Sequence, residues 1–252
     1  MERIRLLVVI CGLIACWANE GLAAMEFEFK ADYLSKYIWR GQNAVDDPVF
    51  QPSINVSYES LTASIWGNID LTNINGNSGD FSEVDYSLDH SAALPGVKAV
   101  GYSVGFIYYD FPGTATSDTT EVYWGLNLEL PLNPSIKVYH DVDEAHGSYV
   151  LLAFSHTIEK IVELGPHTPV GMEIGASLGW GSASYNKYYW GTSRSELDDL
   201  AFSVGFPFEI KGWTIRPSLN YVTLVSGGIR DTDAYVTGSD FFFAGVGLSK
   251  KF

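Results

Sequence analysis

Apolar and polar residues alternate position by position along most of this 252-residue chain. A period of two is typical of a β-strand with two different faces, because successive side chains point to opposite sides of the strand. Twelve such segments lie between turn-forming residues. They cover residues 29–39, 50–58, 61–71, 84–92, 100–108, 122–130, 136–142, 148–158, 170–180, 200–208, 213–221 and 242–252. The pattern predicts an all-β chain of about 12 strands.

One face of each predicted strand is almost free of charge. In the apolar phase only Lys250 is charged, and it lies close to the end of the sequence. The alternate phase carries Lys30, Asp32, Lys36, Asp70, Glu83, Asp85, Asp89, Lys137, Asp141, Glu173 and Arg216. A Lys or Arg that faces lipid at the middle of a bilayer costs about 2–4 kcal/mol. This segregation therefore favours strands with one face against lipid.

The sizes of the residues and the lengths of the connections indicate which face is outside. The polar phase is rich in Gly and Ser, which are too small to coat a soluble sandwich. The predicted connections alternate between short turns and long loops, and only residues 159–168 break the alternation. Outer-membrane barrels have short periplasmic turns and long external loops. We therefore predict a transmembrane, antiparallel, up-and-down β-barrel with both termini on the periplasmic side, and with bulges at Pro52 and Pro217, which cannot donate to a ladder.

The N-terminus has the order of a secretory signal peptide. Basic residues are followed by an apolar run and then by Gly21-Leu22-Ala23, small residues that suit cleavage. We expect a signal peptide at 1–23 and an outer-membrane barrel at 24–252. An alternative is a lipobox ending at Cys16, with a lipidated N-terminus. Both cysteines, Cys11 and Cys16, lie in this segment, so the predicted mature chain has no disulfide and no thiol site.

Composition excludes other classes. The net charge of −15 argues against a nucleic-acid partner. No later stretch approaches 18 apolar residues, so no transmembrane helix is expected. The sequence offers no cofactor-binding motif and does not determine an oligomeric state.

Two segments carry a family resemblance. Ser35 to Gly41 has the pattern S-x-Y-[VI]-[FW]-R-G, and the pattern D-x-P-x-x-Q follows, with Pro48 and Gln51 at its fixed positions. A strand with Leu61, Trp66 and Gly67 follows. Together they resemble the TorF porin family of Gram-negative bacteria. The resemblance covers only the start of the predicted mature chain; it implies an outer-membrane barrel and a pore, and it supplies no substrate or catalytic residue. Without the family resemblance, Arg40-Gly41 is equally well interpreted as the end of a strand followed by a turn.

The last strand ends in an aromatic residue. Val246, Leu248 and Phe252 alternate back from the C-terminus. This ending resembles the signal read by the barrel assembly machinery, so Phe252 is predicted as the assembly signal. The expected partners are that machinery, outer-membrane lipid and lipopolysaccharide.

These features predict a porin-like channel for passive diffusion of small hydrophilic solutes, with a mild preference for cations. The rival is a structural or adhesive barrel with a closed lumen. The predicted pore-lining residues are Lys36, Arg40, Asp70, Glu83, Asp85, Asp89, Lys137, Asp141, Glu173 and Arg216. Acidic residues outnumber basic ones in this set, and a wall of one sign concentrates counter-ions.

An enzyme and a metal site are the weaker alternatives. His146-Gly147-Ser148 has the His-x-Ser spacing of outer-membrane phospholipases, but Tyr149-Val150 stands where those enzymes have Asn-Gly. Two oxygen-rich loops suit Ca²⁺ chemically; they contain Asp141, Asp143, Glu144 and His146, and Asn73, Asn75, Asn77 and Asp80. Such loops are more often solvated turns. We predict no enzymatic activity and no metal.

Overall fold

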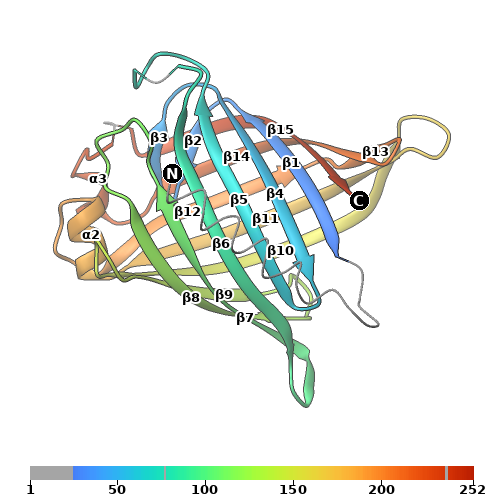
Figure 1. The fold of residues 1–252 in the computed structure, drawn as a ribbon, viewed down its shortest axis with the longest axis horizontal. Helices are drawn as coiled ribbons and strands as arrows, with labels where there is room; N and C mark the ends of the chain where they lie inside the picture. Colours follow the sequence, from blue (N-terminus) through green and yellow to red (C-terminus); the bar gives the residue numbers. More distant parts are fainter. Residues whose placement is uncertain (1–24, 77, 236–237) are drawn as a thin grey trace.

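A computed structural model describes residues 25–76, 78–235 and 238–252, and these form one closed antiparallel β-barrel (Figure 1). The wall strands are β1 Glu26–Leu34, β4 Val49–Tyr58, β5 Leu61–Asp70, β6 Phe81–Leu94, β7 Val97–Asp110, β8 Thr119–Leu128, β9 Ser135–Asp141, β10 Ser148–Glu163, β11 Pro169–Gly181, β12 Glu196–Gly205 with β13 Phe208–Ile210, β14 Trp213–Leu224 and β15 Asp240–Lys251. The short β13 continues β12 after a break, so the wall has the 12 strands predicted. The predicted signal peptide and both cysteines lie outside the described residues.

The first and last wall strands close the barrel. β1 pairs antiparallel with both β4 and β15, and β10 pairs with β11. The backbone N–H of Phe252 donates to the carbonyl of Phe27 at 2.9 Å. Both ends of the wall therefore meet at the same rim of the barrel, which we call the terminal end.

The outward face is the apolar face that the alternation predicts. Ile54, Trp124, Phe202 and Val246 are among its exposed large side chains. Side chains in the alternate phase of the strands point inward; Gln51, Asn68, Glu121 and Tyr123 are examples, and all four are buried. A coat of exposed apolar side chains on this scale is unfavourable in water and favourable against lipid.

The first predicted strand, residues 29–39, is wrong in its second half. The wall strand ends at Leu34, and the chain then enters a separate hairpin of β2 Tyr37–Trp39 and β3 Gln42–Val45. Tyr37 and Trp39, predicted to face lipid, pack inside the barrel instead. Alternation alone missed this, because a hairpin strand keeps the same period of two as the wall strand before it.

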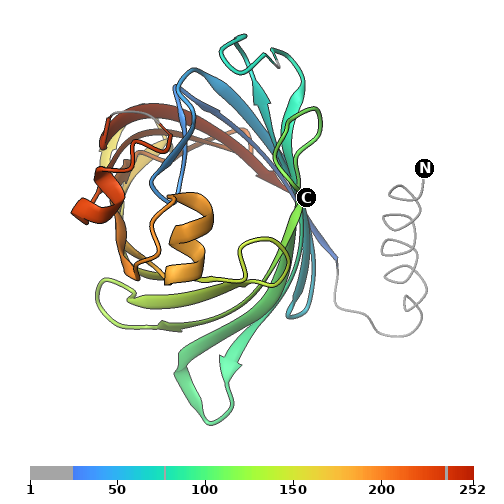
Figure 2. The ribbon, with the colours of Figure 1, turned by 90° about the vertical axis from the view of Figure 1, so that its left-hand side faces the viewer.

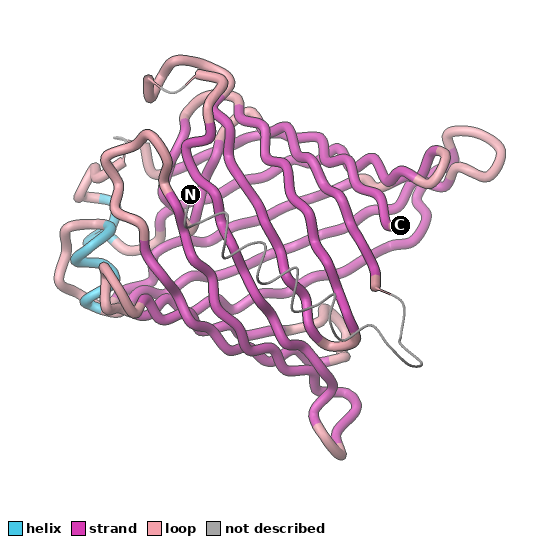
Figure 3. The backbone as a smooth tube through the Cα atoms, in the orientation of Figure 1, coloured by secondary structure: helices cyan, strands magenta, loops and turns pink. Residues whose placement is uncertain are grey.

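The long connections lie at one end of the barrel and the short turns at the other (Figure 3). Two long loops carry helices, α2 Ala183–Tyr189 and α3 Gly227–Arg230. We call this the loop end. The stretch 159–168 does not break the alternation of long and short connections. β10 continues to Glu163 and β11 begins at Pro169, so only a short turn joins them. None of the described helices is long and apolar enough to cross a membrane.

The two prolines do not produce the predicted bulges. Pro52 pairs with Ala31, and Pro217 pairs with Val246, without a shift in register. Beside Pro217 the neighbouring strand is interrupted instead: Phe206 and Pro207 separate β12 from β13, and the Phe206 N–H donates to the Pro217 carbonyl at 2.9 Å. Since Pro has no N–H to offer on that side, the break in the partner strand accommodates it.

Candidate functional site in the barrel lumen

Arg40 lies at the tip of the β2–β3 hairpin and points into the barrel. Arg40 and Gly41 both have positive φ, +48° and +81°, the conformation of a type I′ two-residue turn. A Cβ on Gly41 would lie 2.8 Å from Leu224 Cδ2 and 2.9 Å from Asp199 Cβ, so glycine also permits close approach to the wall. The turn interpretation of Arg40-Gly41 is thus confirmed, and the turn places the guanidinium in the lumen.

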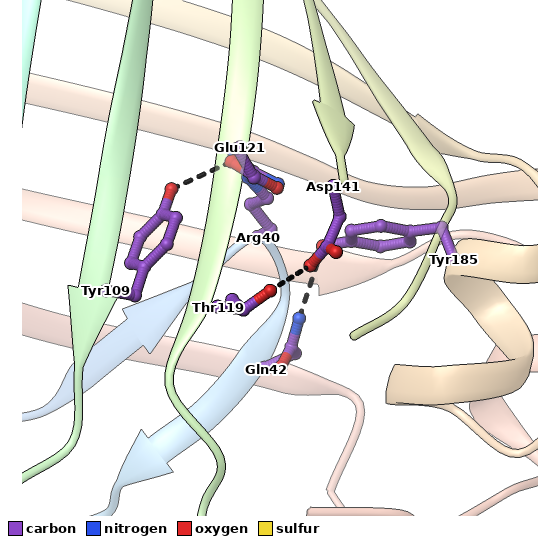
Figure 4. A network of polar contacts seen from close by, with 7 residues as sticks. All are labelled: Arg40, Gln42, Tyr109, Thr119, Glu121, Asp141 and Tyr185. Atoms are coloured by element: carbon purple, nitrogen blue, oxygen red, sulfur yellow. Dashed lines mark hydrogen bonds and ion pairs between the residues drawn. The ribbon is translucent and has the colours of Figure 1, made fainter. Parts of the chain in front are cut away.

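The guanidinium of Arg40 forms a bidentate ion pair with Glu121 of β8 (Figure 4). Nη1 and Nη2 each donate to one carboxylate oxygen at 2.7 Å, and both side chains are buried. Tyr109 also donates its hydroxyl to Glu121 at 2.8 Å. Parallel charge-assisted hydrogen bonds fix orientation as well as distance, so the hairpin is held against the β8 wall.

Aromatic rings surround the same guanidinium. Its Cζ lies 4.4 Å from the ring centroid of Trp39, 4.3 Å from that of Tyr139 and 4.5 Å from that of Tyr149. Tyr185 of α2 lies beyond them, with its ring centroid 5.4 Å from that of Tyr149. Cation–π contacts are strongest when the cation is desolvated, and here they join the hairpin, the wall and the helix.

The mouth of the barrel is packed around this pair. Figure 2 looks into the loop end and shows the β2–β3 hairpin and α2 lying across it. Gln42 donates to the hydroxyl of Tyr185 at 3.4 Å. Burial of Tyr185 raises the pKa of its phenol well above the usual range. An apolar cluster of Trp190, Val222, Leu224, Ile229, Phe241 and Phe243 fills the mouth beside α2 and α3. The prediction that small inward residues leave the lumen unfilled fails at this end.

Two predicted pore-lining acids serve as loop anchors. Asp141 is fully buried; its carboxylate accepts from Thr119 Oγ1 at 2.8 Å and from the N–H groups of Asp143 and Ala145 at 3.0 Å. Asp70 accepts from Asn68, Ser82 and Asn75 at 2.8–3.2 Å. Every one of these contacts is with a donor, so Asp141 and Asp70 are anchors of hydrogen-bonded turns; Asn77 of the second oxygen-rich loop lies outside the described residues.

The predicted acidic row on β6 faces the lumen but is divided between two environments. Asp85 lines an inner cavity of about 430 Å³ beneath the hairpin, and its Oδ1 has no hydrogen-bond partner among the described residues. Asp89 accepts from the Tyr123 hydroxyl at 2.6 Å and lines a wider cavity of about 730 Å³. Glu83 is buried near the mouth.

The predicted basic residues do not form one surface. Lys137 lines the wide cavity, with Nζ 4.3 Å from the ring centroid of Tyr123. Arg216 forms an ion pair with Glu173 across the ladder, and Gly205 leaves room for its guanidinium. Lys36 was predicted to line the pore wall, but it lies in the connection before β2. There it pairs with Asp46 and holds the pKa of that carboxyl below its usual range.

The wide cavity is lined by many hydroxyl and amide side chains. Its wall carries Asn55, Ser57, Thr62, Ser64, Ser87, Ser91, Ser103, Asn127 and Ser135, together with Glu28, Asp89 and Lys137. Tyr139 and Leu151 line both this cavity and the inner one. The two spaces therefore adjoin along the barrel, and the hairpin tip with Arg40 lies at the inner one.

Sequence reasoning missed three buried acids, Glu121, Asp198 and Asp199. Glu121 has the inward phase of its strand, so alternation was sufficient to find it. Asp198 and Asp199 fall in a bulge: Leu178 pairs with Leu200 and Trp180 with Leu197, so both aspartates lie opposite Gly179. A bulge puts two successive residues on one side, which a strict period of two cannot predict.

His146 and Ser148 do not form the pair that the weaker alternative, an enzyme, would require. His146 has a positive φ of 46° in the turn before β10, whereas Ser148 Oγ lies 2.9 Å from Nδ1 of His140 on β9. Among the described residues, no three His, Cys, Asp or Glu side chains converge as a metal site. The absence of enzymatic activity stays a prediction.

Comparison with known proteins gives structural similarity only. No family model and no curated protein matches the sequence. The NanC porin is 13% identical over 90% of this chain and 100% of its own, with a TM-score of 0.49. LpxR from Salmonella typhimurium is 8% identical over 90% and 99%, also at 0.49, and OmpT of Vibrio cholerae is 9% identical over 91% and 97%, at 0.34. The TorF resemblance is not confirmed. The described residues form a closed antiparallel β-barrel of 12 strands.

Proposed function

We propose that this protein is an outer-membrane channel for passive diffusion of small hydrophilic solutes. The observation that carries the proposal is the wide cavity of about 730 Å³. Half of its lining residues are Ser, Thr or Asn, and it adjoins a second cavity of about 430 Å³. Hydroxyl and amide groups replace the hydration of a passing polar solute without binding it tightly.

A mild preference for cations is the finer part of the proposal. Lys137 and the acids Glu28 and Asp89 line the wide cavity, and Glu28 pairs with Lys30 at 3.1 Å. In the inner cavity Arg40 is neutralised by Glu121, while Asp85 and Asp199 add negative charge. Net negative charge on a confined wall concentrates cations.

The packed mouth supports a rival function, a structural or adhesive barrel with a closed lumen. The hairpin, α2 and the apolar cluster occupy the loop end, where solute would enter. A channel therefore requires a path past the hairpin or movement of the hairpin. The two functions differ in whether the protein conducts ions.

Planar-bilayer recording separates them. Purified, refolded protein is expected to give reproducible steps in conductance, with a reversal potential of cationic sign in a KCl gradient. The triple variant Glu83→Gln, Asp85→Asn, Asp89→Asn is expected to shift that potential towards zero. Absence of steps across independent preparations would favour the closed barrel; steps with an unshifted potential would remove the acidic row from the selectivity mechanism.

A further inference from the structure

A group of buried oxygen atoms without donors lies between α2, β12 and the loop of α3. It consists of both carboxylate oxygens of Asp198, Oδ1 of Asn186 and Oε2 of Glu196. None of the four makes a hydrogen bond of normal geometry within the described residues, although the Gly181 N–H and the Asn186 side chain lie near Asp198, and Asp198 and Asn186 are 0% exposed. A buried, ionised carboxylate without a donor or a counter-ion is strongly unfavourable, so this group requires either a proton or a bound cation.

Two glycines allow the oxygens to approach one another. A Cβ on Gly181 would lie 2.1 Å from Asn186 Oδ1 and 2.4 Å from Asp198 Oδ2, so these two oxygens are at most 4.5 Å apart, the sum of the two distances. Gly181 pairs with Glu196 in the ladder. On the other side, a Cβ on Gly228 of α3 would lie 2.4 Å from Glu196 Oε2. Asn186 Oδ1 and Asp198 Oδ2 therefore lie close together at Gly181, and Glu196, two residues before Asp198 on β12, places Oε2 against α3.

The orientation of the Asn186 amide is fixed by its other end. Nδ2 donates to the carbonyl of Gly181 at 3.2 Å and to that of Arg194 at 3.0 Å. Turning the amide round would place Oδ1 against two carbonyl oxygens, so the network assigns the oxygen to the side of Asp198. The close approach of two acceptor oxygens, Asn186 Oδ1 and Asp198 Oδ2, therefore does not result from a wrongly oriented amide.

The nearby cations do not neutralise this group. Arg194 Nη1 is 3.9 Å from Glu196 Oε1, but its side chain is 75% exposed. Arg40 is held by Glu121. Asp141, equally buried, differs in that its carboxylate has three donors. A water molecule would supply donors to Asp198 but no charge.

We propose that Asp198, Glu196 and Asn186 bind a calcium ion. The donor set is made only of oxygen, carries two negative charges and has irregular geometry, which suits Ca²⁺. Mg²⁺ demands near-octahedral geometry and keeps several waters, which a fully buried group disfavours. The ion would join α2 to β12 and to the α3 loop, and so hold the mouth in its packed arrangement whether or not the barrel conducts.

Terbium luminescence tests the site directly. Tb³⁺ replaces Ca²⁺ at oxygen sites, and Trp190, one helical turn from Asn186, is a sensitiser. The refolded protein in detergent, freed of metal with a chelator, is expected to give saturable luminescence on tryptophan excitation. Ca²⁺ should displace it with an apparent Kd on the order of 10⁻⁴–10⁻³ M, the range of extracellular sites, and Mg²⁺ should not at equal concentration.

Matched variants decide what holds the group together. Asp198→Asn is expected to weaken Ca²⁺ binding at least tenfold, while Asp233→Asn, an exposed aspartate of the α3 loop, keeps wild-type affinity. Asn186→Asp adds a charge; it should bind Ca²⁺ more tightly and melt higher with Ca²⁺ than without. Heat-modifiable gel mobility checks folding, and Glu196→Gln replaces Asp198→Asn if the latter does not fold. A wild-type protein with no displaceable luminescence and no Ca²⁺-dependent Tm, or an Asp198→Asn variant of unchanged affinity, would overturn the site in favour of a proton or water.

Discussion

Arg40 and Glu121 lie 81 positions apart in the sequence and meet in the lumen as a bidentate ion pair, with both N···O distances at 2.7 Å. The pair is the strongest polar contact between the β2–β3 hairpin and the wall. Because it is buried, removal of one partner leaves an unpaired charge, which typically costs about 3–5 kcal/mol.

Glu121→Gln is therefore expected to lower the free energy of unfolding by a few kcal/mol and to loosen the hairpin. Urea unfolding in detergent, followed by tryptophan fluorescence, measures the first effect. Conductance in planar bilayers measures the second, and the open level should rise. Glu129→Gln, in an exposed turn at the terminal end, is the matched control. Equal unfolding midpoints for the two variants would show that the ion pair does not anchor the hairpin.

Charge in the wide cavity should act on permeation in both directions. Lys137→Gln removes the base that lies against Tyr123, and Asp89→Asn removes the acid that Tyr123 bonds. The first variant is expected to increase cation preference and the second to reduce it, as opposite shifts in reversal potential. Lys98→Gln, exposed near the β6–β7 turn, should leave the potential unchanged. Shifts of the same sign in both cavity variants would contradict the proposed field.

The lipid-facing phase can be tested with one arginine. Phe202 is 48% exposed near the middle of β12. Phe202→Arg is expected to destabilise the barrel in lipid vesicles by about 2–4 kcal/mol, whereas Leu130→Arg, in a turn at the terminal end, should cost about 0–1 kcal/mol. Reversible denaturant unfolding in vesicles measures both. A Phe202→Arg barrel as stable as the Leu130→Arg barrel would place that face away from lipid.

Phe252 is expected to matter for assembly more than for stability. Its ring is 68% exposed, so its removal uncovers little packed surface. Phe252→Ala should refold in detergent like the wild-type protein, yet reach the outer membrane of cells several-fold more slowly, as followed by heat-modifiable mobility after pulse labelling. Phe242→Ala, on the same strand and 64% exposed, is the control. Normal cellular assembly of Phe252→Ala would remove the proposed assembly signal.

The sequence by itself determined the wall of this protein. Alternation is a local property, and lipid on one face penalises charge at every second position, so strand number, phase and outward residues such as Ile54 and Phe202 follow from the pattern. The alternation of long and short connections likewise predicted which end carries the loops.

Tertiary structure alone decided what fills the lumen. The hairpin at Arg40 has the same period of two as a wall strand, so its inward fold depends on a partner far away in the sequence, Glu121. The bulge that buries both Asp198 and Asp199 depends on the register against Gly179. Ion pairs and shared oxygen sites form only where residues from different strands meet. Closure of the barrel brings these residues together, and no local sequence pattern predicts which of them will meet.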